Sequence, residues 1–268
     1  MSDKTKIFSY WETSKLKPHI PPYILCCLVS MQRALGDNFL LLTPRNISQH
    51  IDFDFSSKPF LFAGHKDPVK NEISRIVAKS DFLRFEYIRT NGGIWLDADT
   101  IVLKDFFTEI MALLSAEKTL WHSEQFFGGY PNDPIISEAA TNMLKSDRQV
   151  FGNPGNCKEL IQAQKSRVNF IPQSIWDPTG VGEYSAKNWD LPTQVGANAT
   201  NFLKNKACAI VKIYNSAISK THISQQSVES FLNQGTVLSH IFLSIEPDRE
   251  YWFEASRRLE EELRPSPE

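Results

Sequence analysis

Two carboxylates stand two residues apart inside an apolar segment of this chain. Asp97 and Asp99 lie within the run from Ile94 to Leu103. On an extended strand both side chains face the same side, and two buried like charges are costly unless a cation or a polar ligand meets them. A divalent ion with oxygen ligands would relieve their repulsion. The alternative is a pair of solvated aspartates in a turn, but the apolar flanks favour a binding site.

A predicted helix just before this segment carries a second chemical group. Between Ile76 and Ile88, apolar residues recur at the spacing of one helix face, and Arg84 falls in the middle of that stripe. Asp81 lies three residues before it, within contact distance on a helix. A guanidinium on the core face must meet an anion or it destabilises the fold. Arg84 is therefore either a ligand-binding group or a structural arginine paired with Asp81 or Glu86.

The elements around these groups predict an α/β fold. Ile7 to Trp11 and Phe39 to Leu42 read as strands, and a proline-led helix from Pro22 to about Met31 lies between them. This order indicates a βαβ unit and a parallel sheet. Asn91-Gly92-Gly93 ends the arginine helix, because glycine supplies the left-handed cap. Ile94 to Asp97 is then a buried strand, and open α/β sheets bind ligands at the carboxyl ends of their strands.

The second half of the chain shows weaker patterns. Helices are expected near 104–114, 134–144 and 156–164, and short strands near 120–122, 168–171 and 209–214. Gly182 and Gly196 lie in polar, loop-like surroundings. Nothing resembles a linker, so we expect one domain, followed by a charged tail over 256–268.

Bulk composition excludes some classes of function. The 268 residues are 41% hydrophobic and 22% charged, with a formal net charge of −2, which argues against a nucleic-acid binder that works through bulk charge. No apolar run is long enough for a signal peptide or a membrane span, which predicts a cytoplasmic protein. Cys26 and Cys27 are adjacent, while Cys157 and Cys208 are isolated. Free buried thiols are therefore expected rather than disulfides or zinc ligands.

The segments Ala78 to Arg84 and Gly92 to Asp99 together resemble the signature of the DxD sugar-binding glycosyltransferases. Similar groups are glycosyltransferase family 32 and the capsular polysaccharide synthesis transferases, and the glucosylating clostridial toxins share the core pattern. Phe8 to Trp11 with its proline-led helix also fits, as does a turn at Asp177 to Gly180. The resemblance covers the first half of the chain strongly and the second half loosely.

The resemblance implies roles for individual residues. Asp99 would bind Mn²⁺ or Mg²⁺, and Asp97 would contact the ribose or donor sugar and reach the metal. Arg84 and Asp81 would hold the donor sugar and its phosphate side. Trp11 would stack on the nucleobase. The donor-binding set also includes three further residues of the signature: Ser80, Gly92 and Gly93.

A late histidine would complete the metal site in such enzymes. His240 is the first candidate and His222 the second, although a histidine among apolar residues is more often part of the core. The implied fold is a single GT-A-type, Rossmann-like domain. Residues 1–125 would bind the nucleotide-sugar, and the less regular residues 126–255 would form the acceptor side.

The predicted activity is transfer of a hexose from a UDP- or GDP-sugar to a bacterial surface glycan: O-antigen, capsule or lipooligosaccharide. The resemblance implies retention of anomeric configuration. A lipid-linked glycan acceptor would bring the enzyme into peripheral contact with the inner membrane, and no nucleic-acid partner is expected.

Two alternatives remain open. Leu96 to Thr100 also matches the nucleophile loop of haloacid-dehalogenase-type phosphatases, in which Asp97 would attack phosphorus. That fold needs a later acidic pair for magnesium, and no Asp-Asp or Gly-Asp follows Asp99. The other alternative is a catalytically silent relative that binds a sugar nucleotide.

Overall fold

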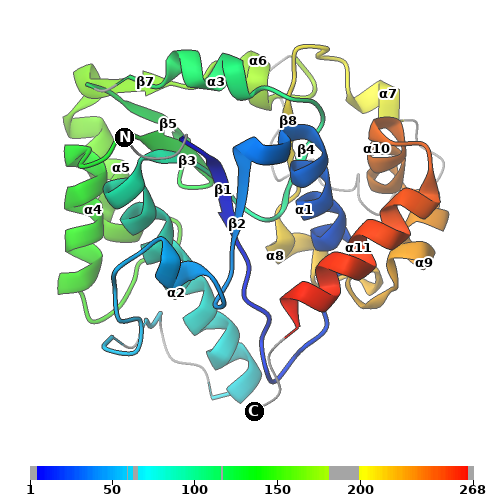
Figure 1. Cartoon of the computed structure of the whole chain (residues 1–268), viewed down its shortest axis with the longest axis horizontal. Helices are drawn as coiled ribbons and strands as arrows, with labels where there is room; N and C mark the ends of the chain where they lie inside the picture. The colour runs from blue at the N-terminus through cyan, green and yellow to red at the C-terminus, as the bar shows by residue number, and fades with distance from the viewer. Residues whose placement is uncertain (1–4, 59, 63–65, 116, 181–198, 265–268) are drawn as a thin grey trace.

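A six-stranded sheet lies between two layers of helices in this computed structural model (Figure 1). The structure describes residues 5–58, 60–62, 66–115, 117–180 and 199–264. The loop predictions at Gly182 and Gly196 and the end of the predicted tail, 265–268, lie outside these residues.

The sheet and a small separate ribbon are built from short strands. Their bounds are β1 (Ile7–Tyr10), β2 (Phe39–Leu42), β3 (Gly93–Leu96), β4 (Thr100–Val102), β5 (Thr119–Ser123), β6 (Phe126–Gly129), β7 (Val168–Phe170) and β8 (Ile210–Lys212). The sheet has the order β2-β1-β3-β6-β5-β7, and β4 pairs with β8 in the ribbon. Strand β6 is antiparallel to β3 and β5, whereas the other pairs in the sheet are parallel. The predicted α/β class is confirmed.

Helices cover both faces of the sheet. Their bounds are α1 (Pro22–Leu35), α2 (Pro68–Asn91), α3 (Phe107–Leu113), α4 (Pro134–Lys145), α5 (Cys157–Ala163), α6 (Gln173–Trp176), α7 (Ala199–Phe202), α8 (Asn215–Ile218), α9 (Val228–Asn233), α10 (Val237–Ile245) and α11 (Arg249–Leu263). Figure 1 shows α2, α4 and α5 on one side, and α1 with α9, α10 and α11 on the other. Each layer has its own buried apolar cluster against the sheet.

Strand β1 has a parallel neighbour on each side, and the two connections run over opposite faces of the sheet. Helix α1 links β1 to β2, and α2 links β2 to β3. The strand order therefore reverses at β1, and α/β sheets bind ligands outside the carboxyl ends of the strands at such a point. Trp11 follows β1 and Asp97 follows β3 at this edge.

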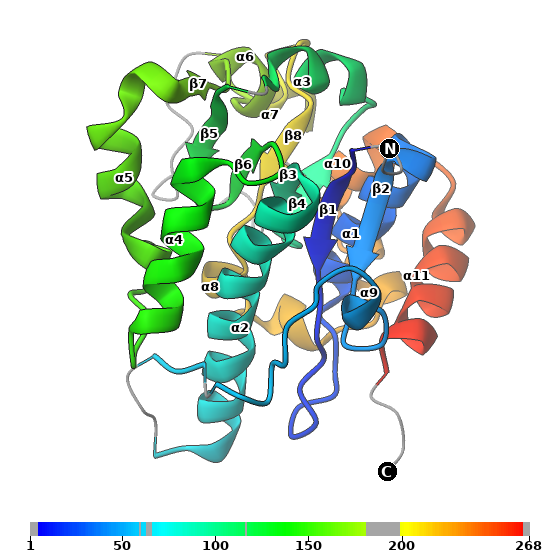
Figure 2. The ribbon, with the colours of Figure 1, turned by 60° about the vertical axis from the view of Figure 1, so that its left-hand side comes forward.

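Helix α2 has the capping chemistry of a well-defined helix. The side chain of Asp67 accepts hydrogen bonds from the first-turn amides, and Pro68 begins the helix. Gly92, with a φ of 70°, ends it. Residues 81–88 are all buried, but Val77, predicted on the core stripe, is 37% exposed. The first half of α2 extends beyond the carboxyl ends of β1 and β2, where no sheet covers it (Figure 2).

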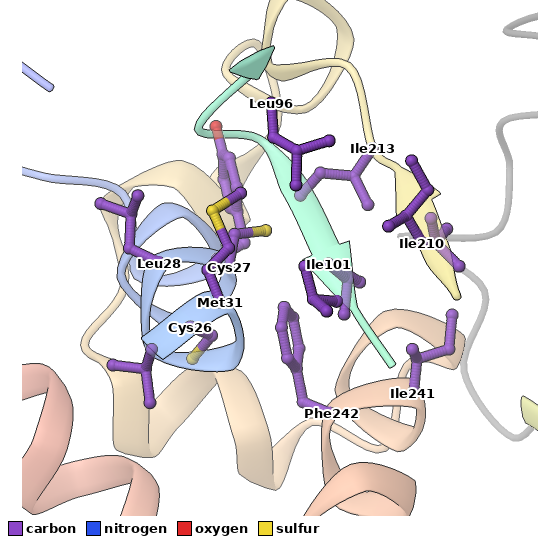
Figure 3. Close-up of a cluster of buried hydrophobic side chains, with 14 of the residues drawn as sticks. Cys26, Cys27, Leu28, Met31, Leu96, Ile101, Ile210, Ile213, Ile241 and Phe242 are labelled. Atoms are coloured by element: carbon purple, nitrogen blue, oxygen red, sulfur yellow. The ribbon is translucent and has the colours of Figure 1, made fainter. Parts of the chain in front are cut away.

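The β4–β8 ribbon is anchored by the second layer of the core. Figure 3 shows side chains of α1, including Cys27 and Met31, facing Ile101 of β4 and Ile210 of β8, with Phe242 of α10 below them. These side chains are at most 3% exposed. The ribbon therefore has a fixed position against α1. All four cysteines are buried and free, as predicted.

Several elements differ from the sequence-based expectations. The apolar run from Ile94 to Leu103 is two strands, β3 and β4, which belong to different sheets. Strand β6, with its two glycines, was not predicted. The charged segment expected as a tail from 256 onward is instead the end of α11, which buries Trp252 and Leu259 against the core. Its apolar residues lie on one helical face between charged ones, so the charge alone was misleading.

No helix in the described part of the chain is long and apolar enough to span a bilayer.

Gly93 provides a test of how tightly the first strands approach one another. Its φ is 130°, and an added Cβ would lie 2.9 Å from the backbone oxygen of Lys6. We expect Gly93→Ala to lower the free energy of unfolding by about 2–4 kcal/mol, from backbone strain and overpacking together. Urea denaturation measures the change. Gly36→Ala is the matched control, because Gly36 also has a positive φ, 50°, but nothing lies within 4 Å of its Cβ position; it should cost about 1 kcal/mol. Equal losses would contradict the close approach.

Candidate active site

Charged side chains from three elements meet where β3 ends. Asp97 and Asp99 occupy the turn between β3 and β4, Asp81 and Arg84 come from α2, and Lys212 comes from β8. We call these five residues the charge cluster. It combines three carboxylates with two cations, and it lies at the carboxyl edge of the sheet where the strand order reverses.

Arg84 joins the helix to the strand. Its Nη2 donates to Asp81 Oδ1 at 2.5 Å, and its Nη1 donates to Asp97 Oδ1 at 3.1 Å. The Trp95 indole Nε1 donates to the same oxygen at 2.7 Å. The predicted structural pairing with Asp81 is thus present, and the contact with Asp97 adds a partner that was not predicted. The other predicted partner, Glu86, pairs with Arg89 instead.

Burial and charge act in opposite directions on the Arg84 pair. Burial alone would lower the pKa of Arg84, but Asp81 and Asp97 more than offset it, so that the pKa is raised. Burial raises the pKa of Asp81 to about 6, despite the neighbouring guanidinium. Arg84 Nε is buried and has no hydrogen-bond partner among the described residues. A buried donor of this kind is costly to leave unpaired.

Lys212 bridges the two DxD carboxylates. Its Nζ donates to Asp97 Oδ2 at 2.6 Å and also to Asp99 Oδ1. The lysine side chain is 13% exposed. Burial alone would lower its pKa, but the two carboxylates more than offset that effect and raise it. The lysine is therefore a resident cation between Asp97 and Asp99.

The residues after β8 complete the surroundings of Asp99. The backbone N–H of Asn215 donates to Asp99 Oδ2 at 2.5 Å, and the Asn215 side chain accepts a hydrogen bond from Tyr23 Oη at 2.7 Å. Tyr214 has a φ of 51°, unusual for a residue with a side chain, and Lys212 Nζ lies 5.7 Å from the centre of its ring. Such strained backbone persists only where the surroundings hold it. Here it lets the chain turn around Asp99.

Ribbon pairing places Lys212 beside the carboxylates. Thr100 is opposite Lys212 in the β4–β8 register, and the N–H of Ile213 donates to the backbone oxygen of Asp99 at 2.9 Å. Alternate residues of β8 face opposite sides of the ribbon. Val211 and Ile213 are buried on one side, so the register directs Lys212 to the other, toward the turn that carries Asp97 and Asp99.

The donor set does not fit the divalent ion predicted from the sequence. All four carboxylate oxygens of Asp97 and Asp99 accept hydrogen bonds from protein groups: Arg84, Trp95, Lys212 and the Asn215 amide. Mg²⁺ binds carboxylate oxygens at about 2.0–2.1 Å, which is the space that the ammonium fills. No group of three His, Cys, Asp or Glu residues able to hold a metal ion occurs within the described ranges.

The two candidate histidines do not join the aspartates. His240 lies on α10, and the described residues form no three-ligand group that includes it. His222 is exposed, with its Nε2 3.4 Å from the Gln234 amide. The structure therefore leaves the predicted third ligand separate from Asp97 and Asp99.

The predicted donor-binding residues fall into two groups. Trp11 is half-buried at the edge where β1 ends, with its Nε1 donating to Thr13 Oγ1 at 3.1 Å. Ser80 is half-buried one residue before Asp81. Gly92 and Gly93 lie instead at the opposite, amino end of β3, where Pro131 and Lys6 occupy the space of a side chain. Those two glycines serve chain packing and do not reach the charge cluster.

Sequence reasoning missed the contribution of β8. The strand itself was predicted, and Lys212 is a single charge in the apolar segment Ala209 to Ile213. The argument applied to Asp97 and Asp99, that a charge in an apolar run needs a partner, applies equally to this lysine. Its partners could not be named, because they lie more than 110 residues away in the chain.

The β5–β6 turn closes another side of the site, and His122 precedes it. The backbone N–H of Asp97 donates to the oxygen of Gln125 in this turn at 3.1 Å. The His122 ring lies 4.3 Å from the Trp176 ring, centroid to centroid. Burial lowers the pKa of His122 to about 4. The imidazole is therefore neutral at physiological pH.

We expect Arg84→Met to lower the free energy of unfolding by about 3–5 kcal/mol, because it leaves the buried carboxylate of Asp81 without its cation. Asp81→Asn in the same background should recover part of this loss. A double-mutant cycle by urea denaturation measures the coupling. Strictly additive losses would show that Asp81 and Arg84 do not act as a pair.

His122 predicts a pH dependence of stability. The unfolded chain binds a proton near the ordinary pKa of 6.5, whereas the folded chain does so only near 4. The free energy of unfolding should therefore fall as the pH drops from about 6.5 to about 4, by up to about 3 kcal/mol from this group. His122→Gln should flatten that slope in denaturation curves across the same window. His222→Gln controls for removal of a histidine, and an unchanged slope in His122→Gln would refute the assignment.

Comparisons with known proteins match the first half of the chain to a family and most of the chain to solved structures. Residues 1–130 match the family described as capsular polysaccharide synthesis protein. No curated protein matches the sequence significantly. The solved apo form of the glycosyltransferase GlyE from Streptococcus pneumoniae TIGR4 is 11% identical, with 97% of this chain and 65% of that chain covered and a TM-score of 0.47. The apo bifunctional glycosyltransferase WbbM is 10% identical, with 96% and 52% covered and a TM-score of 0.47.

A third similar structure is the galactosyltransferase LgtC with donor and acceptor sugar analogs. It is 10% identical, with 86% of this chain and 95% of that chain covered and a TM-score of 0.36. The chain spans less than two thirds of the length of GlyE and WbbM. The predicted resemblance to the capsular polysaccharide synthesis transferases is thus confirmed for residues 1–130.

Proposed function

We propose that this protein is a glycosyltransferase that moves a hexose from a UDP- or GDP-sugar to a bacterial surface glycan. One observation carries the proposal: the charge cluster lies at the carboxyl edge of the sheet, at the point where the strand order reverses. Such edges bind nucleotides in α/β folds. The match of residues 1–130 to the capsular polysaccharide synthesis family supports the choice of glycan.

The charges of the site suit a sugar–diphosphate donor. Two bare aspartates would repel a diphosphate, but Arg84 and Lys212 offset most of the negative charge of Asp81, Asp97 and Asp99. Carboxylates accept hydrogen bonds from sugar and ribose hydroxyls, and cations stabilise the charge that develops on a leaving phosphate. In this proposal Asp97 and Asp99 face the sugar and ribose, while the two cations face the phosphates.

The reaction exchanges one carbon–oxygen bond for another. The bond from the anomeric carbon to the β-phosphate oxygen breaks, and its electron pair leaves with the nucleoside diphosphate. The acceptor hydroxyl oxygen forms the new bond, and its proton ends on the released diphosphate. With attack on the leaving-group side, the anomeric configuration is retained, as the family resemblance implies.

Arg84 and Trp11 supply two further contacts in the proposal. The unpartnered Nε of Arg84 is a donor suited to a ligand oxygen. Trp11 offers a half-buried ring at the end of β1, next to the cluster edge, and a stacked base gains about 1–3 kcal/mol on such a ring. The divalent ion is left out of this proposal, because Lys212 occupies its place.

The acceptor side is the less defined part of the proposal. It comprises the second half of the chain, and its substrate is a glycan or a lipid-linked glycan. A lipid-linked acceptor would be met at the inner face of the membrane through peripheral contact. Capsule, O-antigen and lipooligosaccharide all offer acceptors of this kind.

The phosphatase alternative is less compatible with the geometry. A nucleophilic Asp97 would need an oxygen free to attack phosphorus, yet Oδ1 accepts from Arg84 and Trp95, and Oδ2 accepts from Lys212. The silent relative keeps the same binding site, so only turnover separates it from an active transferase.

Nucleotide binding tests the proposal first. Thermal unfolding with UDP, GDP, CDP and their sugars should show stabilisation by one nucleotide class, because a ligand that binds only the folded state raises the melting temperature. Trp11→Ala should weaken the affinity for that nucleotide by about tenfold or more, from lost stacking, without changing the ligand-free melting temperature by more than a few degrees. Phe151→Ala, which removes a ring that is 76% exposed, is the matched control.

The outcomes separate an active transferase from a silent relative. Binding accompanied by release of nucleoside diphosphate from the sugar nucleotide supports a transferase, because such enzymes hydrolyse their donors slowly in water. Binding without any release in the presence of acceptor glycans would indicate the silent relative. Failure to bind any of the nucleotides would refute the proposed function.

A further inference from the structure

We propose that the Lys212 ammonium takes the place of the divalent cation in this site, and that the protein binds the diphosphate of its donor without a metal ion. The inference rests on the proposed function for the identity of the ligand. It rests on the charge cluster for the identity of the cation.

The first argument is that every oxygen of the two carboxylates already accepts a hydrogen bond from the protein. Asp97 accepts three hydrogen bonds and Asp99 accepts two, all from groups of the described chain. Lys212 alone contacts one oxygen of each aspartate. A metal ion could reach both aspartates only by displacing that lysine, or by breaking the contacts made by Arg84, Trp95 or the Asn215 amide.

The second argument is exclusion. A Mg²⁺ ion requires carboxylate oxygens at about 2.0–2.1 Å, and the ammonium nitrogen already lies 2.6 Å from Asp97 Oδ2. An ion shared by Asp97 and Asp99 would overlap the ammonium, and the two positive charges would repel one another. The metal and the lysine therefore compete for one position.

The third argument is that the strand which carries the lysine is fixed. Strand β8 is paired with β4 and packed on α1, which holds the Lys212 backbone beside the two aspartates. The strained backbone of Tyr214 and the hydrogen bond from Asn215 N to Asp99 fix the residues that follow β8 in the same way. To leave, the ammonium would have to break two ion pairs, after which Asp97 would keep Arg84 and Asp99 would keep the Asn215 N–H.

The chemistry of transfer can proceed with such a cation. The leaving diphosphate needs positive charge near its oxygens, and Lys212 and Arg84 bring two unit charges from β8 and α2 to the same edge. A divalent ion would supply the same total charge at one point. The electron pair of the broken bond still leaves on the diphosphate, so no further reactant is needed.

The experiment measures Mn²⁺ itself, before any nucleotide. Free Mn²⁺ gives a six-line electron paramagnetic resonance signal that disappears on binding. The wild-type chain should leave this signal unchanged at Mn²⁺ equimolar with protein. Lys212→Met, which keeps most of the apolar stem and removes the charge, should bind about one Mn²⁺, and adding Asp99→Asn should abolish that binding. Lys220→Met, at an exposed lysine, is the matched control and should behave as wild type.

A second arm uses the nucleotide that stabilises the wild-type chain. Its affinity should be the same within twofold in EDTA and in Mn²⁺ for the wild type. For Lys212→Met the affinity in EDTA should fall at least tenfold, and Mn²⁺ should restore part of it. Ligand-free melting curves establish that each variant is folded.

The wild-type measurements test whether the site binds donor without a metal ion, even if Lys212→Met does not fold. Wild-type protein that binds Mn²⁺ and loses it with Asp99→Asn, or that binds nucleotide only with Mn²⁺, would overturn the inference while leaving the proposed function standing. Wild-type protein that binds neither Mn²⁺ nor any nucleotide would refute the proposed function, with Lys212 still acting as the resident cation.

Discussion

The cost of burying like charges is the constraint on which this structure depends. Three carboxylates are gathered at one edge of the sheet, and the two cations that pair with them come from α2 and β8. Removing one member of a buried ion pair commonly costs about 3–5 kcal/mol, a large part of the stability of an ordinary domain. The helix α2, the turn after β3 and the ribbon strand β8 must therefore keep their relative positions for the fold to be stable.

This requirement connects the two halves of the chain. The sheet core and α2 come mainly from the first half, whereas β8 follows more than 80 residues after β6. The β4–β8 ribbon is only three residues long on each strand, so its pairing alone would be weak. Packing on α1 and the ion pairs of Lys212 supplement it. The same contacts that hold the ribbon thus complete the site.

The sequence predicted the first half of the fold well, because its signals are local. The apolar stripe of α2, the glycine at its end and the apolar β1 and β2 all act within a few residues. Asp81, Arg84, Asp97 and Asp99 could be grouped for the same reason. The predictions at Gly92 and Gly93 assigned donor binding to glycines that close packing requires. Either role would call for glycine at these positions, so the sequence could not separate them.

The second half was harder to predict because the roles of its charged and apolar residues depend on contacts with residues far away in the sequence. Lys212 shows a local anomaly, a charge in an apolar strand, but the partners that explain it are set by ribbon register. Helix α11 similarly shows a charged sequence whose apolar face packs against α1, α9 and α10. Local patterns can indicate that such residues need a partner, and only the tertiary structure can identify it.

An ammonium and a divalent ion place different demands on the rest of a site. A metal ion needs several oxygen ligands at fixed distances, so a site built for it must leave carboxylate oxygens open. An ammonium donates three hydrogen bonds and needs only acceptors, so the remaining oxygens can be used to hold the protein together. In this chain they are used in that way, by Trp95 and the Asn215 amide. Under the proposed function, the site would gain its cation on folding, and its readiness to bind donor would follow the stability of the β4–β8 ribbon.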